Sequence, residues 1–482
     1  MNRRQALRGL LATATTMGWL GGCAAGRVQS PLPVWGDTFG RRLVYRDDPD
    51  YEAWRTGAAW QNYKHARYPD VIARPQSVDE VVTCVQLAIR DNLRVAVRSG
   101  GHNVSGAFLR DGGMLLDLGA LRDVHIDAAA RTAWVGPAIW SRNLAQRLGA
   151  AGFAFPYAHC ATVPMGGYLL GGGVGVNGDS WGGIACANIL AADVVLASGE
   201  RVTVSADDHP DLYWAVRGGG TGFPGVVTAY RLRLHDAPTH VVASAYVFPV
   251  TAAGDAAGWL ERVRASAPAK TELMMLMARG PAGPMAVVRF AAFAQSADEA
   301  KRLLTPYARA PEAAQALARM EFVPGSMERS FIESMDATRG LGFGSYAVET
   351  VWTDDLPASA AATVDLFGQA PSPGTHLLIS PRINNRVPGD AAFSRIGRSF
   401  LGAYTVWKDP ADDADNHAWL ADMTQVMGRG AAGRYVNETD GFAARERVLT
   451  CYSDTAWERL GAVREKYDPW QRFHGFPGWD AA

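Results

Sequence analysis

Residues 155–235 read FPYAHCATVPMGGYLLGGGVGVNGDSWGGIACANILAADVVLASGERVTVSADDHPDLYWAVRGGGTGFPGVVTAYRLRLH, and the rest of the chain is organised around this stretch. It contains one glycine cluster at 166–175 and a second at 218–225, which leads into a strand-like run from residue 226. Glycines at this density let backbone N–H groups approach a ligand closely and adopt positive φ. Successive inward-pointing N–H groups form a concave site for phosphate oxygens. Tight turns between strands are the alternative that either cluster alone leaves open.

A third glycine cluster lies upstream, in RSGGHN at 98–103. It follows LRVAV at 93–97, whose alternation indicates a strand. Three such clusters together favour a phosphate-bearing cofactor. None of them is a Gly-x-Gly-x-x-Gly that opens a helix or a Gly-x-x-x-x-Gly-Lys-Ser/Thr loop. The sequence therefore predicts neither a Rossmann fold nor a phosphate-loop fold.

The motifs RSGGH, CATV and GGGTGFPGVVT resemble the flavin-binding half of the berberine bridge enzyme-like proteins, a branch of the vanillyl-alcohol oxidase and para-cresol methylhydroxylase flavoproteins. YVNETD and KYDP near the C-terminus continue the resemblance, which is strong over roughly 55–236 and 430–475 and weak between them. It implies FAD as the cofactor, covalently bonded through both His102 and Cys160.

The resemblance also implies a set of residues around the flavin. These are Arg98, Ser99, Gly100, Gly101, Asn103, Val163, Gly166, Gly167, Gly172, Gly173, Gly225, Val226, Val227, Tyr435 and Asn437. The pair Pro164-Met165 departs from the Gly-x that is common in the family. Ala187 stands where relatives often have aspartate.

The expected fold class is α+β, with a two-part FAD-binding domain and an inserted substrate domain of antiparallel sheet and helices. The predicted parts are a signal at 1–23, a linker at 24–54, an FAD-binding domain of para-cresol methylhydroxylase type at 55–236, a substrate domain at 237–427 and a C-terminal segment at 428–482 that completes the FAD domain. The resemblance implies that this last segment delivers residues to the flavin ring.

Composition fits a soluble globular protein with a full core, since 48% of the 482 residues are hydrophobic and 20% are charged. A net charge of −1 gives no electrostatic case for nucleic acid as a partner. The five cysteines show no metal-ligand spacing and no Cys-x-x-Cys, and no other constellation predicts a metal site.

The N-terminus reads as an export signal. Arg3-Arg4 precede an uncharged, mildly apolar stretch that is too short to span a membrane. The arginine pair resembles a twin-arginine signal, and Leu20-Gly21-Gly22-Cys23 resembles a bacterial lipobox. We therefore expect an exported protein on the periplasmic or envelope side, lipid-anchored through Cys23. A cleaved signal in which Cys23 is incidental is the alternative.

Periodicity predicts the elements of the first half. Strands are expected at 94–98, 114–118, 123–127, 132–135, 193–197, 201–204 and 226–234, and helices at 78–91, 141–150 and 166–172. Ser77 is the expected N-cap of the first helix, with Glu80 three residues on. In the second half, strands are expected at 241–250, 271–279, 285–292, 374–383 and 404–407, and helices at 297–304, 356–367 and 457–467.

An oxidase acting on an alcohol needs a hydride acceptor and a base for the hydroxyl proton. The resemblance implies that the base lies in the Tyr435-Val436-Asn437-Glu438 segment, and a partly desolvated carboxylate at Glu438 suits the task because burial raises its pKa. Tyr435 is the orienting or alternative group. A surface carboxylate and a core tyrosine are the alternatives for these two residues, and His159 is assigned a structural role ahead of a substrate-polarising one.

The expected function is oxidation of an alcohol to a carbonyl compound, with O₂ reduced to H₂O₂. Relatives oxidise sugars, aromatic alcohols and polycyclic metabolites, and the sequence does not distinguish these classes. The resemblance includes Val163, three residues after Cys160, a position at which a small side chain in the family implies access for O₂. A dehydrogenase that passes electrons to a quinone or a protein is the first alternative. A non-enzymatic ligand-binding protein of the envelope is the second.

Overall fold

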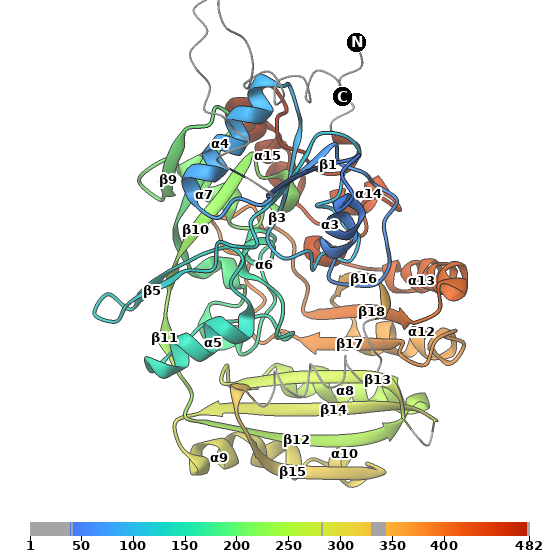
Figure 1. The fold of residues 1–482 in the computed structure, drawn as a ribbon. Coiled ribbons are helices and arrows are strands. Elements are labelled where there is room, and N and C mark those ends of the chain that lie inside the picture. Colours follow the sequence, from blue (N-terminus) through green and yellow to red (C-terminus); the bar gives the residue numbers. More distant parts are fainter. Residues whose placement is uncertain (1–38, 40–41, 281–282, 329–343, 480–482) are drawn as a thin grey trace, which may run out of the picture.

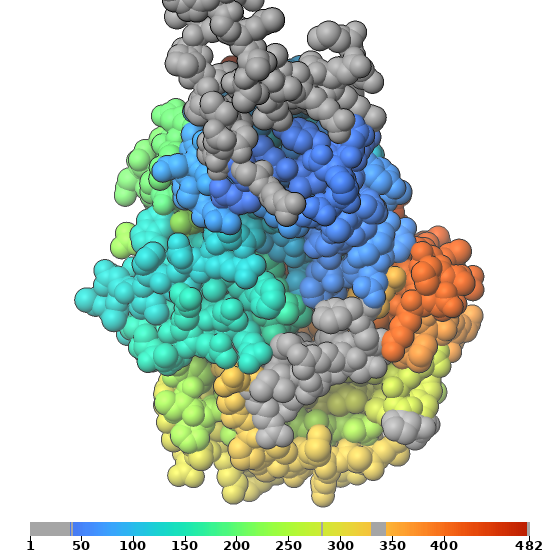
Figure 2. All heavy atoms as spheres, viewed as in Figure 1, coloured from blue at the N-terminus to red at the C-terminus, as the bar shows by residue number. Residues whose placement is uncertain are grey.

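The computed structural model of the chain describes Phe39 and residues 42–280, 283–328 and 344–479. The export signal and Cys23 lie outside these residues, so those expectations stay predictions. None of the described helices combines the length and the apolar character that a membrane crossing requires. Figure 1 shows two small sheets and their helices above a large sheet, and the same two regions face each other in the space-filling view (Figure 2).

The first small sheet has the strand order β1-β2-β4-β3. Its strands are β1 (Leu43–Tyr45), β2 (Val71–Ala73), β4 (Met114–Asp117) and β3 (Val95–Arg98). β2 and β3 run parallel to β4, and helix α4 (Val78–Arg90) connects β2 to β3. The side chain of Ser77 accepts a hydrogen bond from the backbone N–H of Glu80 at 3.2 Å, so the predicted helix start is confirmed. β3 ends at Arg98, where the RSGGHN loop begins.

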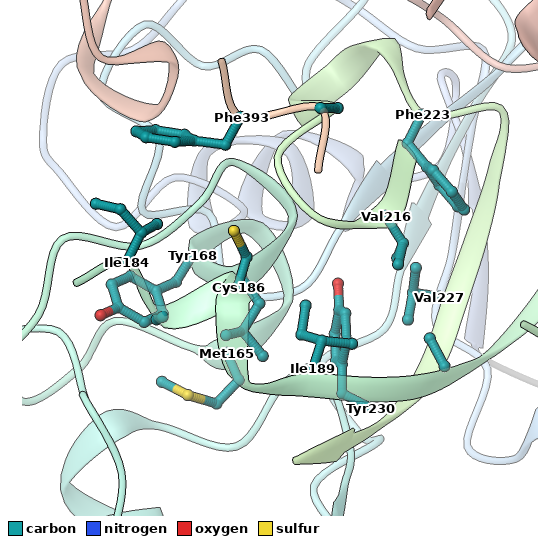
Figure 3. Close-up of a cluster of buried hydrophobic side chains, with 14 of the residues drawn as sticks. Met165, Tyr168, Ile184, Cys186, Ile189, Val216, Phe223, Val227, Tyr230 and Phe393 are labelled. Carbon is teal, nitrogen blue, oxygen red and sulfur yellow. The ribbon is translucent and has the colours of Figure 1, made fainter. Parts of the chain in front are cut away.

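The second small sheet is antiparallel, with the order β5-β6-β10-β8-β9. Its strands are β5 (Val124–Asp127), β6 (Thr132–Val135), β10 (Gly225–Arg233), β8 (Ile189–Leu196) and β9 (Arg201–Ser205). Helices α5 (Ser141–Ala150), α6 (Met165–Leu170) and α7 (Pro210–Val216) accompany it. Figure 3 shows Met165 of α6 with Ile189 and Tyr230 of the sheet in the shared apolar core. Both glycine clusters are thereby attached to a rigid core.

The large sheet is a seven-stranded antiparallel one with the order β15-β12-β14-β13-β17-β18-β16, in agreement with the predicted class of the second region. Its strands are β15 (Ala318–Gly325), β12 (His240–Pro249), β14 (Gly283–Ala294), β13 (Thr271–Gly280), β17 (His376–Pro381), β18 (Ser399–Trp407) and β16 (Ser345–Thr353). The helices of this region are α8 (Ala253–Arg264), α9 (Ala297–Ala308), α10 (Pro311–Ala314), α12 (Leu356–Gly368) and α13 (Asp413–Gly428). Strand β15, strand β16 and helices α8 and α13 were absent from the sequence prediction.

Side chains alternate between the two faces of this sheet, as the pleat requires. On β13, Leu273, Met275 and Met277 are at most 1% exposed and join the core with α8 and α12. Met274 and Leu276 face the other way and are half-buried. One face of the sheet is therefore packed against helices, and the opposite face is left to line a cavity.

The C-terminal segment packs against the first region. Phe473 forms a parallel bridge with Val95 of β3, and the Val95 N–H donates to the carbonyl of Arg472 at 2.7 Å. Helices α14 (Arg445–Leu449) and α15 (Asp454–Tyr467) lie in this segment. The hydroxyl of Tyr452 donates to the carbonyl of Gly218 at 2.9 Å, which ties the segment to the second glycine cluster.

A buried ion cluster joins the same segment to the large sheet. Glu349 of β16 is 1% exposed and pairs with Arg447 at 2.6 Å and Arg434 at 3.1 Å. Its carboxylate also accepts from the backbone N–H of Asp440 at 3.1 Å. A buried carboxylate needs such partners because an unpaired charge in the interior is strongly unfavourable.

Arg447→Ala is therefore expected to lower the free energy of unfolding by about 1.5–3 kcal/mol, the usual loss for a hydrogen bond to a charged group. Urea denaturation followed by tryptophan fluorescence measures it. Arg201→Ala is the control, because Arg201 pairs with Asp79 at the exposed surface, where ion pairs contribute less than about 1 kcal/mol. Equal losses in the two variants would contradict a stabilising role for the buried cluster.

Candidate active site

A cavity of about 840 Å³ lies between the glycine loops and the free face of the large sheet. Most of the residues expected around a flavin line it. They are Arg98, Ser99, Gly100, Gly101, His102, Asn103, Cys160, Val163, Gly166, Gly167, Gly225, Val227, Tyr435, Asn437 and Glu438. These residues come from segments as far apart as 98–103 and 435–438, so the fold brings the sequence motifs together.

Three of the expected flavin-contacting residues do not line the cavity. A side chain at Gly172 would meet the ring of Phe393, and one at Gly173 would meet the ring of Tyr168 at 2.8 Å. Both glycines have positive φ and allow close packing of the loop on neighbouring rings. Val226 is fully buried in the core formed with α4.

The glycines that do line the cavity form one of its walls. A side chain at Gly100 would collide with Pro164, so the first loop can approach the 160–167 segment only with glycine here. A Cβ on Gly167 would meet no atom within 4 Å, and this exposed residue borders the open cavity. The side chain of Ser99 accepts from the Gly167 N–H at 3.4 Å. This wall therefore presents backbone rather than side chains to a ligand.

His102 and Cys160 lie side by side at this wall. The Sγ of Cys160 is 4.0 Å from Nε2 of His102, and Oγ1 of Thr162 lies within 3.5 Å of the sulfur and 2.9 Å of the nitrogen. The indole of Trp60 stacks on the imidazole, with ring centroids 4.2 Å apart. Burial lowers the pKa of His102 to about 3, so the ring is neutral at physiological pH and keeps a nitrogen lone pair for bonding.

Tyr435 and Asn437 attach the C-terminal segment to helix α6. The phenol oxygen of Tyr435 accepts from the N–H of Val174 at 3.3 Å and from the side-chain amide of Asn437 at 2.9 Å. The same amide donates to the carbonyl of Tyr168 at 3.2 Å. Burial, with a contribution from the nearby Glu438, raises the pKa of Tyr435 well above its ordinary value. Tyr435 is therefore a protonated, anchored group at neutral pH.

Glu438 faces the cavity at the end of the short 3₁₀ turn Val436–Glu438. Burial raises the pKa of its carboxyl to about 7, against the lowering effects of a hydrogen bond from Tyr404 and of the charge of His159. The hydroxyl of Tyr404 donates to Oε2 of Glu438 at 2.9 Å. A pKa raised toward neutrality suits a carboxylate that accepts a proton near neutral pH.

The structure adds aromatic residues that sequence reasoning did not assign to the site. Tyr404 stacks on His376, with centroids 5.0 Å apart and planes 6° from parallel. Tyr346 lies beside Trp60, and its phenol oxygen is buried without a hydrogen-bond partner among the described residues. All four line the cavity. Tyr404 falls in the strand expected at 404–407, but this strand is buried almost throughout, so no alternation marks a residue that faces the cavity.

His159 borders the cavity and contacts a buried carboxylate. Its Nε2 lies 3.3 Å from Oε2 of Glu272, a buried residue at the start of β13. Burial opposes ionisation of Glu272, but His159, Arg289 and the N–H of Asn177 together lower the pKa of its carboxyl to about 2. The lowered pKa keeps Glu272 ionised at neutral pH, and its carboxylate holds the His159 ring at the edge of the cavity.

The features of the cavity fit FAD. The glycine wall presents backbone close to a ligand, His102 and Cys160 offer two adjacent nucleophilic atoms, and the Tyr346 hydroxyl is a buried donor without a partner among the described residues. Comparison with known proteins agrees, since residues 69–205 match the family described as FAD binding domain.

Full-length similarity extends the comparison. The FAD-linked oxidoreductase ptmO of Penicillium ochrochloron is 27% identical over 89% of this chain and 94% of its own. Among solved structures, 6-hydroxy-D-nicotine oxidase from Arthrobacter nicotinovorans has the same fold, with a TM-score of 0.79, 24% identity, and coverage of 91% of this chain and 98% of its own.

The grass pollen allergen Phl p 4, which has glucose dehydrogenase activity, shares the fold at a TM-score of 0.77 and 20% identity, over 90% of this chain and 96% of its own. An isoleucine-to-valine variant of that allergen is a glucose oxidase. The comparisons thus support an enzyme and not a ligand-binding protein of the envelope. The chain is an oxidoreductase with an FAD-binding domain.

Proposed function

We propose that the protein is an FAD-dependent oxidase that converts an alcohol to a carbonyl compound. The observation that carries the proposal is Glu438, a cavity carboxylate whose pKa is raised to about 7 and which Tyr404 holds by a hydrogen bond. FAD, bound by the glycine wall and bonded to His102 and Cys160, would supply the hydride acceptor. The cavity that contains both nucleophiles also contains the base.

Glu438 is the general base in this proposal. Its ionised carboxylate accepts the proton of the substrate hydroxyl, while a hydride leaves the carbon that bears this hydroxyl. The alcohol thereby loses two electrons and two hydrogens and becomes a carbonyl compound. The Tyr404 hydroxyl occupies Oε2, which leaves Oε1 for the substrate. Tyr435 is the alternative proton acceptor, but its raised pKa and two incoming hydrogen bonds favour a positioning role.

O₂ as the electron acceptor is supported by Val163, which lines the cavity three residues after Cys160. In the allergen Phl p 4, a valine in place of an isoleucine accompanies the change from glucose dehydrogenase to glucose oxidase. A dehydrogenase with a quinone or protein acceptor is the second candidate function.

The experiment that tests the proposal has two stages. An alcohol panel is mixed anaerobically with the purified protein, and bleaching of the flavin absorbance reports substrate oxidation. Air is then admitted in a stopped-flow instrument, and fast recovery of the absorbance with release of H₂O₂ identifies an oxidase. Slow recovery would assign the dehydrogenase alternative. Absence of bleaching with every alcohol would refute alcohol oxidation.

Tyr404→Phe is expected to move the pH dependence of the reaction. The Tyr404 hydrogen bond stabilises the ionised form of Glu438 and so lowers the pKa of that carboxyl; without it the pKa rises above about 7. Because the base acts when ionised, kcat/KM increases as pH rises through this pKa. The midpoint of that increase should shift to higher pH, and kcat/KM at pH 6 should fall more than at pH 9. An unshifted midpoint would show that Tyr404 does not act on the base.

A further inference from the structure

The cavity wall opposite the glycine loops is made by three strands of the large sheet. The residues of β13, β17 and β18 that line it are Met274, Leu276, Ala278, Arg279, His376, Leu378, Ser380, Phe400 and Tyr404. Leu276 lies beside Leu378 in register, and Leu378 lies beside Gly402. The centre of this wall therefore exposes hydrocarbon to the cavity.

Gly402 brings two aromatic rings together on the same wall. A Cβ at this position would lie 2.9 Å from Cε2 of Tyr404 and 3.1 Å from Cε1 of Phe400. Any larger side chain would push these rings apart. With glycine, the rings of Phe400 and Tyr404 close over the strand, and His376 stacks on Tyr404 from β17. The result is an aromatic surface continuous with the leucines.

Most polar side chains of this wall make a hydrogen bond within the protein, although the Nε of Arg279 has no partner among the described residues. Arg279 is its only charged residue among those that the structure describes, and its guanidinium donates to the carbonyls of Gly368 and Ala370 at 3.0 and 3.1 Å. The Tyr404 hydroxyl donates to Glu438, and Nδ1 of His376 lies 3.0 Å from the carbonyl of Gly374. A hydroxyl-rich molecule against this wall would exchange water for hydrocarbon, which is unfavourable without replacement hydrogen bonds.

We infer that the substrate is an alcohol carried on an apolar, ring-containing skeleton, and not a sugar. The skeleton packs against Leu276, Leu378 and Phe400, and the single reacting hydroxyl meets Glu438. The statement that the substrate is an alcohol rests on the proposed function. The preference for an apolar skeleton rests on the residues that form the cavity wall.

Binding is tested with carbonyl compounds of the product type, which have no alcohol to oxidise. Isothermal titration of the flavin-loaded protein compares 2-acetylnaphthalene, acetophenone and D-glucono-1,5-lactone. We expect 2-acetylnaphthalene to bind about tenfold more tightly than acetophenone, because a fused ring removes more apolar surface from water. The lactone should bind more weakly than either ketone.

Leu378→Asn places an amide on the apolar wall and should weaken binding of 2-acetylnaphthalene about tenfold or more. Leu317→Asn is the matched control, because Leu317 is 72% exposed and lies outside the cavity. It should leave the dissociation constant unchanged. Tighter binding of the lactone, no binding of 2-acetylnaphthalene, or equal effects of the two substitutions would each overturn the inference.

Anaerobic flavin reduction by 2-naphthalenemethanol and by D-glucose then separates the two levels of the argument. Flavin reduction by glucose without ketone binding would refute the apolar substrate class and would leave the proposal of an alcohol oxidase intact. Ketone binding without flavin reduction by any alcohol would refute alcohol oxidation and would still support binding of an apolar skeleton at this wall. Reduction by 2-naphthalenemethanol, with glucose inactive, supports both.

Discussion

Glu438→Gln is expected to lower the rate constant of anaerobic flavin reduction by about 10²–10⁴-fold, the usual contribution of a general base. The amide keeps the size of the side chain and can still accept a hydrogen bond from Tyr404, but it cannot take up a proton at neutral pH. Substrate affinity and flavin content should change little, since the loss arises in the transition state. Stopped-flow absorbance over a range of pH measures the effect.

Glu446→Gln is the matched control for this experiment. Glu446 lies eight residues further along the same C-terminal segment, in α14, and is exposed to solvent. Its substitution should leave the reductive rate unchanged. If Glu438→Gln reduces its flavin within a few-fold of the unmodified protein, Glu438 is not the base. Tyr435→Phe is then the next variant, and a large loss there would move the role to the phenol.

The double variant His102→Ala/Cys160→Ala is expected to lose all acid-stable flavin. The His102 nitrogen and the Cys160 sulfur lie 4.0 Å apart on the same cavity wall, so each can form one bond to the same ligand. Either single variant should keep one bond and remain yellow after acid precipitation. Absorbance of the redissolved pellet, with mass spectrometry of the flavin-bearing peptide, measures the outcome.

Cys186→Ala provides the control for thiol chemistry. Cys186 is fully buried in the core shown in Figure 3 and does not line the cavity. Burial raises the pKa of its thiol to about 12, which keeps it protonated and unreactive. This variant should retain acid-stable flavin. A colourless pellet from the unmodified protein, with free flavin in the supernatant, would rule out both covalent bonds.

Local patterns predicted the elements whose residues carry their own signal. Helix α4 could be predicted because its N-cap, Ser77, and its apolar periodicity are both local features of the sequence. Strand β16 was missed because all nine of its residues are buried, including Glu349, so no alternation marks it. Strand β15 was missed for the opposite reason, since most of its residues are exposed.

The sequence by itself determined the chemistry that depends on residue type and close spacing. The motifs that hold His102, Cys160 and Glu438 were identifiable through their resemblance to a flavoprotein family because each motif is short and contiguous, and the structure places all three residues on one cavity. The sequence did not show which residues that are far apart in the chain lie close together in the fold. Cys160 follows His102 by 58 residues, and nothing local states that sulfur and nitrogen approach to 4.0 Å.

Only the tertiary structure decided which groups surround Glu438 and which side chains form the opposite wall of the cavity. Tyr404 reaches Glu438, and Trp60 reaches His102, because the strand register and the returning C-terminal segment bring them together. The raised pKa of Glu438 has the same origin, since desolvation depends on every segment that encloses a carboxylate. Such properties belong to the packed cavity, and no single stretch of the chain encodes them.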